Sequence, residues 1–135
     1  MIMTPDMIQY IEAHAEKALQ LLIDMARIPA PSGHEEQRAE FCLNLLRSCG
    51  VENAYIDKAK NVICSIGDTG SNDLVVFMAH SDVVFPDTDP LPLRIENGRI
   101  YCPGVGDDTA NAVALLTVAG CIAEQRLTPR DCGVL

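Results

Sequence analysis

The sequence predicts an α/β fold, and three observations support this prediction. The run 74–79, LVVFMA, is apolar without interruption, as expected of a strand that is buried on both faces of a sheet. Longer stretches carry apolar residues at the spacing of one helix face. The chain has 135 residues, of which 48% are hydrophobic, so it can form a single domain with a core of its own.

Two helices are predicted in the first part of the chain. The first begins after Thr4, with proline at the first helical position, and should end before Pro29, because the residue before a proline avoids α geometry. Ser32 and Glu35 fit a capping box at the start of the second helix. Gly50 is well placed to end that helix.

Shorter elements and a third helix follow. Residues 51–57 and 61–66 are predicted to be two short strands. Asn97-Gly98 lies between two alternating runs, which is a strong signal for a hairpin. Residues 110–122 describe a third, largely buried helix, and residues 132–135 are predicted to begin another strand.

Composition restricts the partners and the compartment. The net charge of −9 argues against a nucleic-acid backbone or an anionic membrane as the partner. No signal peptide is visible, and no run approaches the roughly 18 apolar residues of a membrane span. The six cysteines form no CxxC pair and are interpreted as thiols in a reducing compartment, so a cytoplasmic location is expected.

Polar chemistry begins abruptly after the apolar run, at His80 and Asp82. In an extended chain, residues two apart point to the same face, so the carboxylate can orient the imidazole. A histidine oriented in this way is a common metal ligand. The alternative is a histidine that merely ends a strand, and a three-residue pattern does not decide between the two.

A second cluster lies in residues 104–108, GVGDD, at the start of the third predicted helix. A glycine loop there could cradle a phosphate, which would suggest a nucleotide-binding domain, but two carboxylates repel phosphate and no lysine follows. Asp107 and Asp108 could instead cap the helix and interact with its dipole. In a third reading, one of them caps the helix while the other reaches a metal.

The two clusters together favour a metal site. His80, Asp82 and Asp107 all follow the ends of apolar elements, so each can lie at the carboxyl edge of one sheet, where ligands bind in open α/β folds. Imidazole with carboxylate suits zinc, or less selectively cobalt and manganese. Asp107 has two oxygens and could bridge two ions.

The motifs resemble those of a known family. MAHSDVVFP followed by NGRIYCPGVGDDTANAVALL, with IPAPSGHEE and KNVICSIG upstream, is similar to the N-terminal catalytic segment of the di-zinc peptidase and deacylase family. This family includes acetylornithine deacetylase, succinyl-diaminopimelate desuccinylase, glutamate carboxypeptidase, aminoacylase and peptidase T. The chain departs from the pattern at Thr109-Ala110, where many members carry Lys-Gly, and this puts the subfamily in doubt.

The resemblance implies a three-layer α/β sandwich with a mixed, largely parallel sheet. Residues 1–135 would form the N-terminal part of a metallopeptidase catalytic domain, with the dimerisation domain and the C-terminal part absent. His80 would bind one of two zinc ions, Asp107 would bridge both, and Asp82 would assist catalysis by orienting the imidazole.

The implied activity is cleavage of an amide bond in a small peptide or N-acyl amino acid by a metal-activated water. The family's general-base glutamate would lie beyond Leu135, so the chain is expected to be inactive alone. Pairing of an exposed sheet edge with a second copy would give a homodimer. The competing hypothesis is a non-catalytic α/β domain that binds a partner or small ligand.

Overall fold

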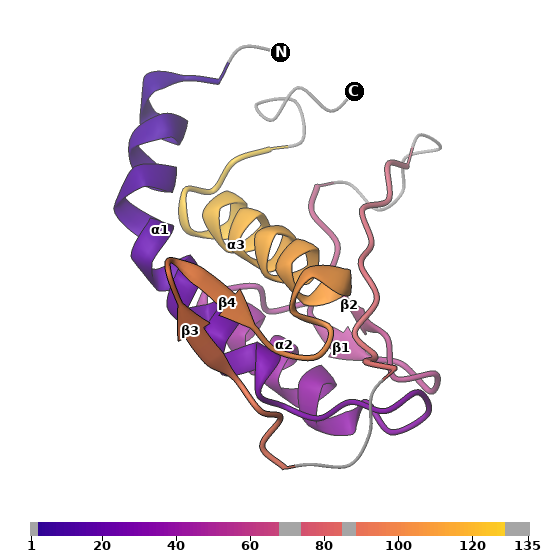
Figure 1. Ribbon diagram of the computed structural model, residues 1–135. Helices are drawn as coiled ribbons and strands as arrows, with labels where there is room; N and C mark the ends of the chain where they lie inside the picture. Colours follow the sequence, from indigo (N-terminus) through magenta and orange to yellow (C-terminus); the bar gives the residue numbers. More distant parts are fainter. Residues whose placement is uncertain (1–2, 68–73, 85–88, 129–135) are drawn as a thin grey trace.

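The computed structural model describes residues 3–67, 74–84 and 89–128, and the helices dominate this part of the chain (Figure 1). Helix α3 packs against both α1 and α2, while α2 also contacts the first of two small hairpins. The elements are, in order, α1 (Pro5–Ala26), α2 (Glu36–Ser48), β1 (Tyr55–Ile56), β2 (Val62–Ile63), β3 (Arg94–Glu96), β4 (Arg99–Tyr101), the short turn η1 (Val105–Thr109) and α3 (Ala110–Glu124).

The predicted helices are confirmed, but one of their caps is not. Thr4 caps α1, because its hydroxyl accepts a hydrogen bond of 3.3 Å from the Met7 N–H. Gly50 follows the end of α2 with a φ of +87°, as a glycine at that position allows. The predicted capping box is wrong: α2 begins without a side-chain cap, and the Ser32 hydroxyl donates instead to the Asp82 carboxylate.

Two clusters of apolar side chains join the helices. The first lies between α1, α2 and α3, and the second between the end of α2, the segment after it and the middle of α3. Leu116 and Val62 pack against both clusters and connect them. The fully or nearly buried members are Met25, Cys42, Ala112 and Val113 in the first cluster, and Leu46, Val51, Ala54 and Ala119 in the second.

The strands are two separate antiparallel hairpins. Strands β3 and β4 pair as predicted around Asn97-Gly98, whose φ values of +51° and +72° suit the tight turn. Strands β1 and β2 also pair, over two residues each rather than the longer ranges predicted for 51–57 and 61–66. No larger sheet joins these hairpins within the described residues.

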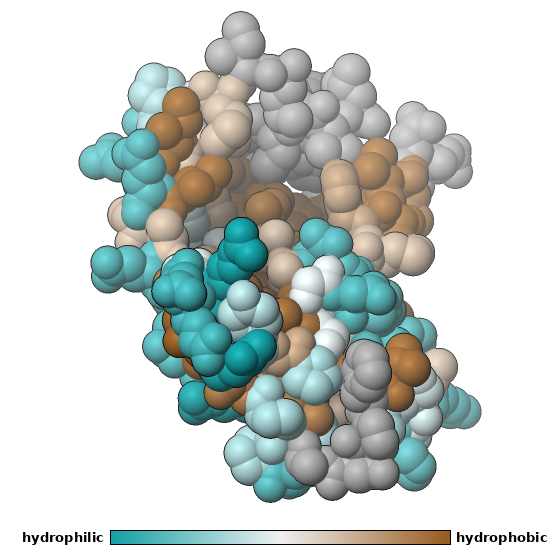
Figure 2. Space-filling model, viewed as in Figure 1, coloured by the Kyte–Doolittle hydropathy of each residue, from teal (hydrophilic) through white to brown (hydrophobic). Residues whose placement is uncertain are grey.

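The apolar run 74–79 does not form the predicted buried strand. It is not assigned to a strand, and the side chains of Leu74 to Met78 are exposed. Figure 2 shows apolar side chains gathered over this segment at the upper right. An apolar strand is stable only when neighbouring strands take its backbone hydrogen bonds and other layers cover its faces. The described residues supply neither for 74–78, whereas Val83 is buried and its N–H donates to the Ala30 carbonyl at 2.7 Å.

The expectation that no run approaches the apolar length of a membrane span does not hold for helix α3. Together with η1 it forms a stretch, Val105–Glu124, that is long and apolar enough to cross a membrane by length and composition. Its contacts with α1 and α2 identify it as a core helix, yet only 28% of the stretch is buried. Val118, for example, is 54% exposed. The prediction of a largely buried helix therefore holds for one side of α3.

Two further predictions concern other parts of the chain. The expected strand at 132–135 lies outside the described residues. Four cysteines of the described part are thiols outside any disulfide, namely Cys42, Cys49, Cys64 and Cys102.

Gly104 provides a test of how the turn before α3 is packed. Its φ is +67°, and a Cβ atom there would lie 2.9 Å from both Cγ atoms of Val83. We expect Gly104→Ala to lower the free energy of unfolding, measured by urea titration, by about 1 to 3 kcal/mol, because it combines backbone strain with overpacking. Gly106→Ala is the matched control, since a Cβ there meets nothing within 4 Å. Equal effects of the two substitutions would contradict this packing.

Candidate metal centre

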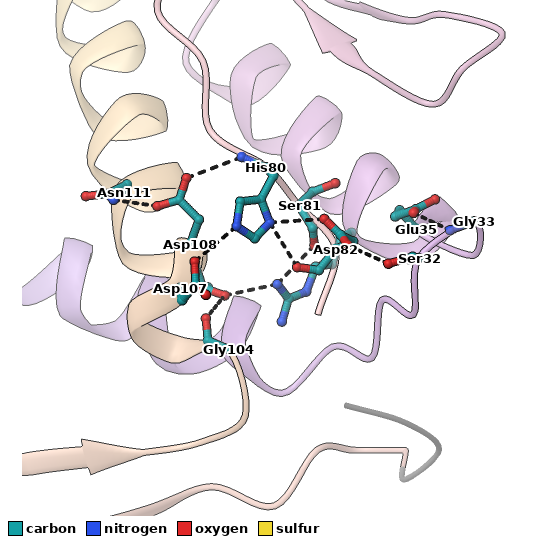
Figure 3. A network of polar contacts seen from close by, with 12 residues as sticks. Ser32, Gly33, Glu35, His80, Ser81, Asp82, Gly104, Asp107, Asp108 and Asn111 are labelled. Carbon is teal, nitrogen blue, oxygen red and sulfur yellow. Dashed lines mark hydrogen bonds and ion pairs between the residues drawn. The ribbon is translucent and has the colours of Figure 1, made fainter. Parts of the chain in front are cut away.

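His80 is the centre of the candidate site, and it lies against Asp107 (Figure 3). The two residues are 27 positions apart, yet His80 Nε2 is 3.2 Å from Asp107 Oδ1. His80 follows the exposed apolar segment, and Asp107 lies in η1 just before α3. The Asp107 side chain is 92% exposed and that of His80 is 47% exposed, so a ligand can reach both.

The other side of the imidazole is held by Asp82. His80 Nδ1 lies 3.0 Å from Asp82 Oδ1 and 3.2 Å from the Asp82 carbonyl. Asp82 Oδ2 in turn accepts a hydrogen bond of 2.6 Å from the Ser32 hydroxyl, in the loop before α2. The orienting role of Asp82 stays a prediction, and in it the Nδ1–H would donate to the Asp82 carboxylate while Nε2 faces Asp107.

Asp108 takes a different place from Asp107. One of its oxygens lies 3.3 Å from the backbone N–H of His80, and the other accepts a hydrogen bond from the Asn111 side chain. Helix α3 has no side-chain cap, so the interpretation in which one of the aspartates caps the helix is not supported. Asp108 instead ties the backbone of His80 to the first turn of α3.

The contact between His80 Nε2 and Asp107 Oδ1 favours a positive charge between the two atoms. When Nδ1 carries the proton of the neutral imidazole, the lone pair of Nε2 faces a carboxylate oxygen, and two acceptors repel at 3.2 Å. A proton on Nε2 or a metal ion removes this repulsion. Accordingly, the contact with Asp107, assisted by the charge of Asp82, raises the pKa of His80. The Ser32 hydrogen bond, assisted by the charge of His80, lowers the pKa of Asp82.

The donor set fits part of a metal site. Imidazole nitrogen and carboxylate oxygen are ligands that zinc accepts, and here both point to one exposed position. Within residues 3–67, 74–84 and 89–128, however, no group of three or more His, Cys, Asp or Glu side chains could hold a metal. A tetrahedral shell therefore needs donors besides these two.

The structure brings His80, Asp82 and Asp107 together, while their roles toward a metal stay predictions. The hydrogen bond from Ser32 to Asp82 was not predicted from the sequence, because Ser32 and Glu35 fit a local helix-capping pattern. No spacing rule connects Ser32 with Asp82, which is 50 residues later. The proline and glycine residues around Ser32, which indicate a stiff loop, were the one signal that this segment has a fixed place.

Comparison with known proteins shows that the chain is similar to part of several hydrolases. No family model matches it. It is 37% identical over 97 residues to a protein of Pyrobaculum aerophilum named as a LysW-lysine/LysW-ornithine hydrolase, an alignment that covers 72% of this chain and 27% of the relative. It is 34% identical over 101 residues to a succinyl-diaminopimelate desuccinylase of Corynebacterium glutamicum, covering 74% of this chain and 26% of that enzyme.

A desuccinylase of Legionella pneumophila is 28% identical over 108 residues, covering 74% of this chain and 28% of the enzyme. The chain thus spans about a quarter to a third of the length of the curated relatives it matches. The relatives in these matches are named as hydrolases, and the paired imidazole and carboxylate lie in a chain that is similar to part of them. The chain is thus homologous to part of these hydrolases, in agreement with the family that its motifs resemble.

The contact between His80 and Asp107 predicts a pH dependence. Because Asp107 raises the pKa of His80, this contact stabilises the metal-free chain fully below the ordinary histidine pKa, and the stabilisation is lost as the pH rises through the raised value. We expect Asp107→Asn to lower the pKa of His80 toward its ordinary value in an NMR titration of the ring protons. Glu96→Gln, on the β3–β4 hairpin, is the control, and a shift of the same size there would refute the assignment.

The hydrogen bond from Ser32 predicts acid sensitivity. A lowered pKa of Asp82 adds stability above the ordinary aspartate pKa, and this is lost as the pH falls through the folded value. Ser32→Ala removes the first cause of the lowered pKa, so acid unfolding followed by circular dichroism should begin at a higher pH. Ser48→Ala is the control, because Ser48 donates to the Leu45 carbonyl within α2. An unchanged acid transition in Ser32→Ala would contradict the contact.

Proposed function

We propose that the protein to which this chain contributes is a metal-dependent hydrolase that cleaves the amide bond of a small peptide or an N-acyl amino acid. The observation that carries the proposal is the approach of His80 Nε2 to Asp107 Oδ1 at an exposed position, which calls for a cation. The homology to LysW-lysine hydrolases and succinyl-diaminopimelate desuccinylases supports the reaction class.

In this proposal, His80 and Asp107 hold the metal ions. The site would take two zinc ions, with cobalt or manganese as substitutes, and Asp107 would contribute carboxylate ligands to both. The metal would polarise the scissile carbonyl and lower the pKa of a bound water. Asp82 keeps the proton of the imidazole on Nδ1, so that the Nε2 lone pair stays available as a ligand. Ser32 holds Asp82 in that orientation.

The proposed parent fold is the three-layer sandwich with a mixed, largely parallel sheet, in which residues 1–135 form the N-terminal part of the catalytic domain. Two features support it. The Leu74–Met78 segment is extended, apolar and exposed, as a strand without its neighbours would be. Helix α3 likewise has apolar side chains such as Val118 on an exposed side. The free thiols support a cytoplasmic location.

The substrate class rests on the names of the relatives. These proteins are named for LysW-lysine, LysW-ornithine and succinyl-diaminopimelate. The shared chemistry is an amide bond to an amino acid, so we propose an acylated amino acid or a dipeptide for this protein. The departure at Thr109-Ala110 replaces none of the proposed ligands, and the buried Thr109 hydroxyl accepts a hydrogen bond from Arg38.

Metal binding by the chain tests the ligand assignment. We expect zinc to bind the purified chain, measured by competition with a chromophoric chelator, and His80→Ala or Asp107→Ala to weaken binding by more than tenfold, since each removes a ligand. Affinity should rise with pH through the raised pKa of His80, because the proton competes with the metal for Nε2. His34→Ala, which alters an exposed histidine elsewhere, is the control.

Zinc affinity unchanged by either substitution would refute the site and favour the competing hypothesis, a non-catalytic α/β binding domain. The activity itself is tested with the product of the complete reading frame that encodes this chain. We expect it to hydrolyse succinyl-diaminopimelate, other N-acyl amino acids or dipeptides with zinc, cobalt or manganese, and to lose that activity in Asp107→Ala. Hydrolysis of none of them would refute the enzyme reading.

A further inference from the structure

Arg38, on α2, is a fully buried charged residue close to the candidate metal centre. It makes hydrogen bonds to three different segments of the chain. Its Nε donates to the Ile28 carbonyl at 2.8 Å, in the loop after α1. Its Nη1 donates to the Ser81 carbonyl at 3.2 Å and to the Thr109 hydroxyl at 3.0 Å.

The two bonds of Nη1 join the two halves of the site. Ser81 lies between His80 and Asp82, so its carbonyl belongs to the backbone that carries the imidazole. The hydroxyl of Thr109 accepts from Arg38 and donates its own proton to the Gly104 carbonyl at 2.8 Å. That second bond spans η1 and closes the turn that presents Asp107. One nitrogen atom therefore fixes the His80 segment relative to the Asp107 turn.

Burying the charge of Arg38 opposes folding, so stability alone does not explain its position. Its Nη2 is also buried and has no hydrogen-bond partner in the described part of the chain. Desolvation lowers the pKa of the guanidinium, and among the causes that oppose this is the charge of Asp82, on the site side. An apolar side chain of similar size often serves a core as well as a buried charge does. The guanidinium has a different use here, because its rigid fork of N–H donors holds several acceptor atoms at fixed separations.

We propose that Arg38 is a positioning residue that sets the separation of His80 and Asp107 for metal binding. It acts through Ser81 and Thr109 and does not touch the metal. This inference rests on the proposed function, since it assigns Arg38 to the same site. Lysine cannot replace it fully, because an ammonium group has no second donor nitrogen for the Ile28 carbonyl.

The experiment compares Arg38→Met, Arg38→Lys and the milder Thr109→Val in the full chain. We expect zinc affinity to fall by about tenfold or more in Arg38→Met, and by less in Arg38→Lys and Thr109→Val, each of which keeps part of the bridge. Arg47→Met is the matched control: Arg47 is also on α2 and donates to a backbone carbonyl, that of Ala54, at 3.3 Å. It should leave the affinity unchanged. Urea unfolding of each metal-free variant measures stability separately.

A second measurement decides the matter without metal. The nuclear Overhauser contact between the His80 ring and the Asp107 β protons should be present in the original chain and in Arg47→Met, and weakened in Arg38→Met and Thr109→Val. If the chain itself binds no zinc, the proposed metal site fails, while this contact still reports on Arg38. An unchanged contact and an unchanged affinity in Thr109→Val and Arg38→Lys, or in a folded Arg38→Met, would overturn the inference.

Discussion

The contact between an imidazole nitrogen and a carboxylate oxygen 27 residues further along the chain is the constraint on which the candidate site depends. Both atoms are acceptors once the other imidazole nitrogen carries the proton, so they remain close only with a positive charge between them. Below the raised pKa of His80 a proton supplies that charge in the metal-free chain, and a divalent ion carries a larger charge in the same place. Competition between proton and metal at one position follows directly from this geometry.

Several side chains around this contact position His80 and the turn that carries Asp107. Asp82 contacts the imidazole from two residues along the same segment, and Ser32, in the loop before α2, donates a hydrogen bond to Asp82. Asp108, in η1, accepts a hydrogen bond from the backbone N–H of His80. The side chain of Val83 fills the space beside Gly104, where a larger residue would not fit. Three segments that are distant in sequence thus meet at one exposed point.

The sequence predicted those parts of the fold that depend on local signals. The helices and the Asn97-Gly98 hairpin are set by spacing, caps and turn residues within a few positions. The strand at 74–79 was predicted from its apolar composition, but strand formation depends on partners elsewhere in the chain, which composition does not reveal. His80, Asp82 and Asp107 stood out because they are polar residues that follow apolar elements.

Ser32 and Arg38 could not be recognised in the same way. Ser32 had a plausible local partner in Glu35, and only the tertiary structure shows that an ionised carboxylate attracts its hydroxyl instead. Arginine is most often found at the surface, and nothing in the spacing along α2 indicates that Arg38 is fully buried. Both residues act across more than 40 positions of sequence, beyond the reach of any periodic pattern.

The exposed Leu74–Met78 segment has a consequence for biosynthesis. Five consecutive apolar residues without a charge, in an extended conformation, form a template on which another polypeptide can add as a strand. Until such a segment is covered, it is also the kind of peptide that chaperones retain to prevent aggregation. His80 lies two residues after the end of that segment. The candidate metal centre is therefore next to a part of the chain that promotes aggregation during folding.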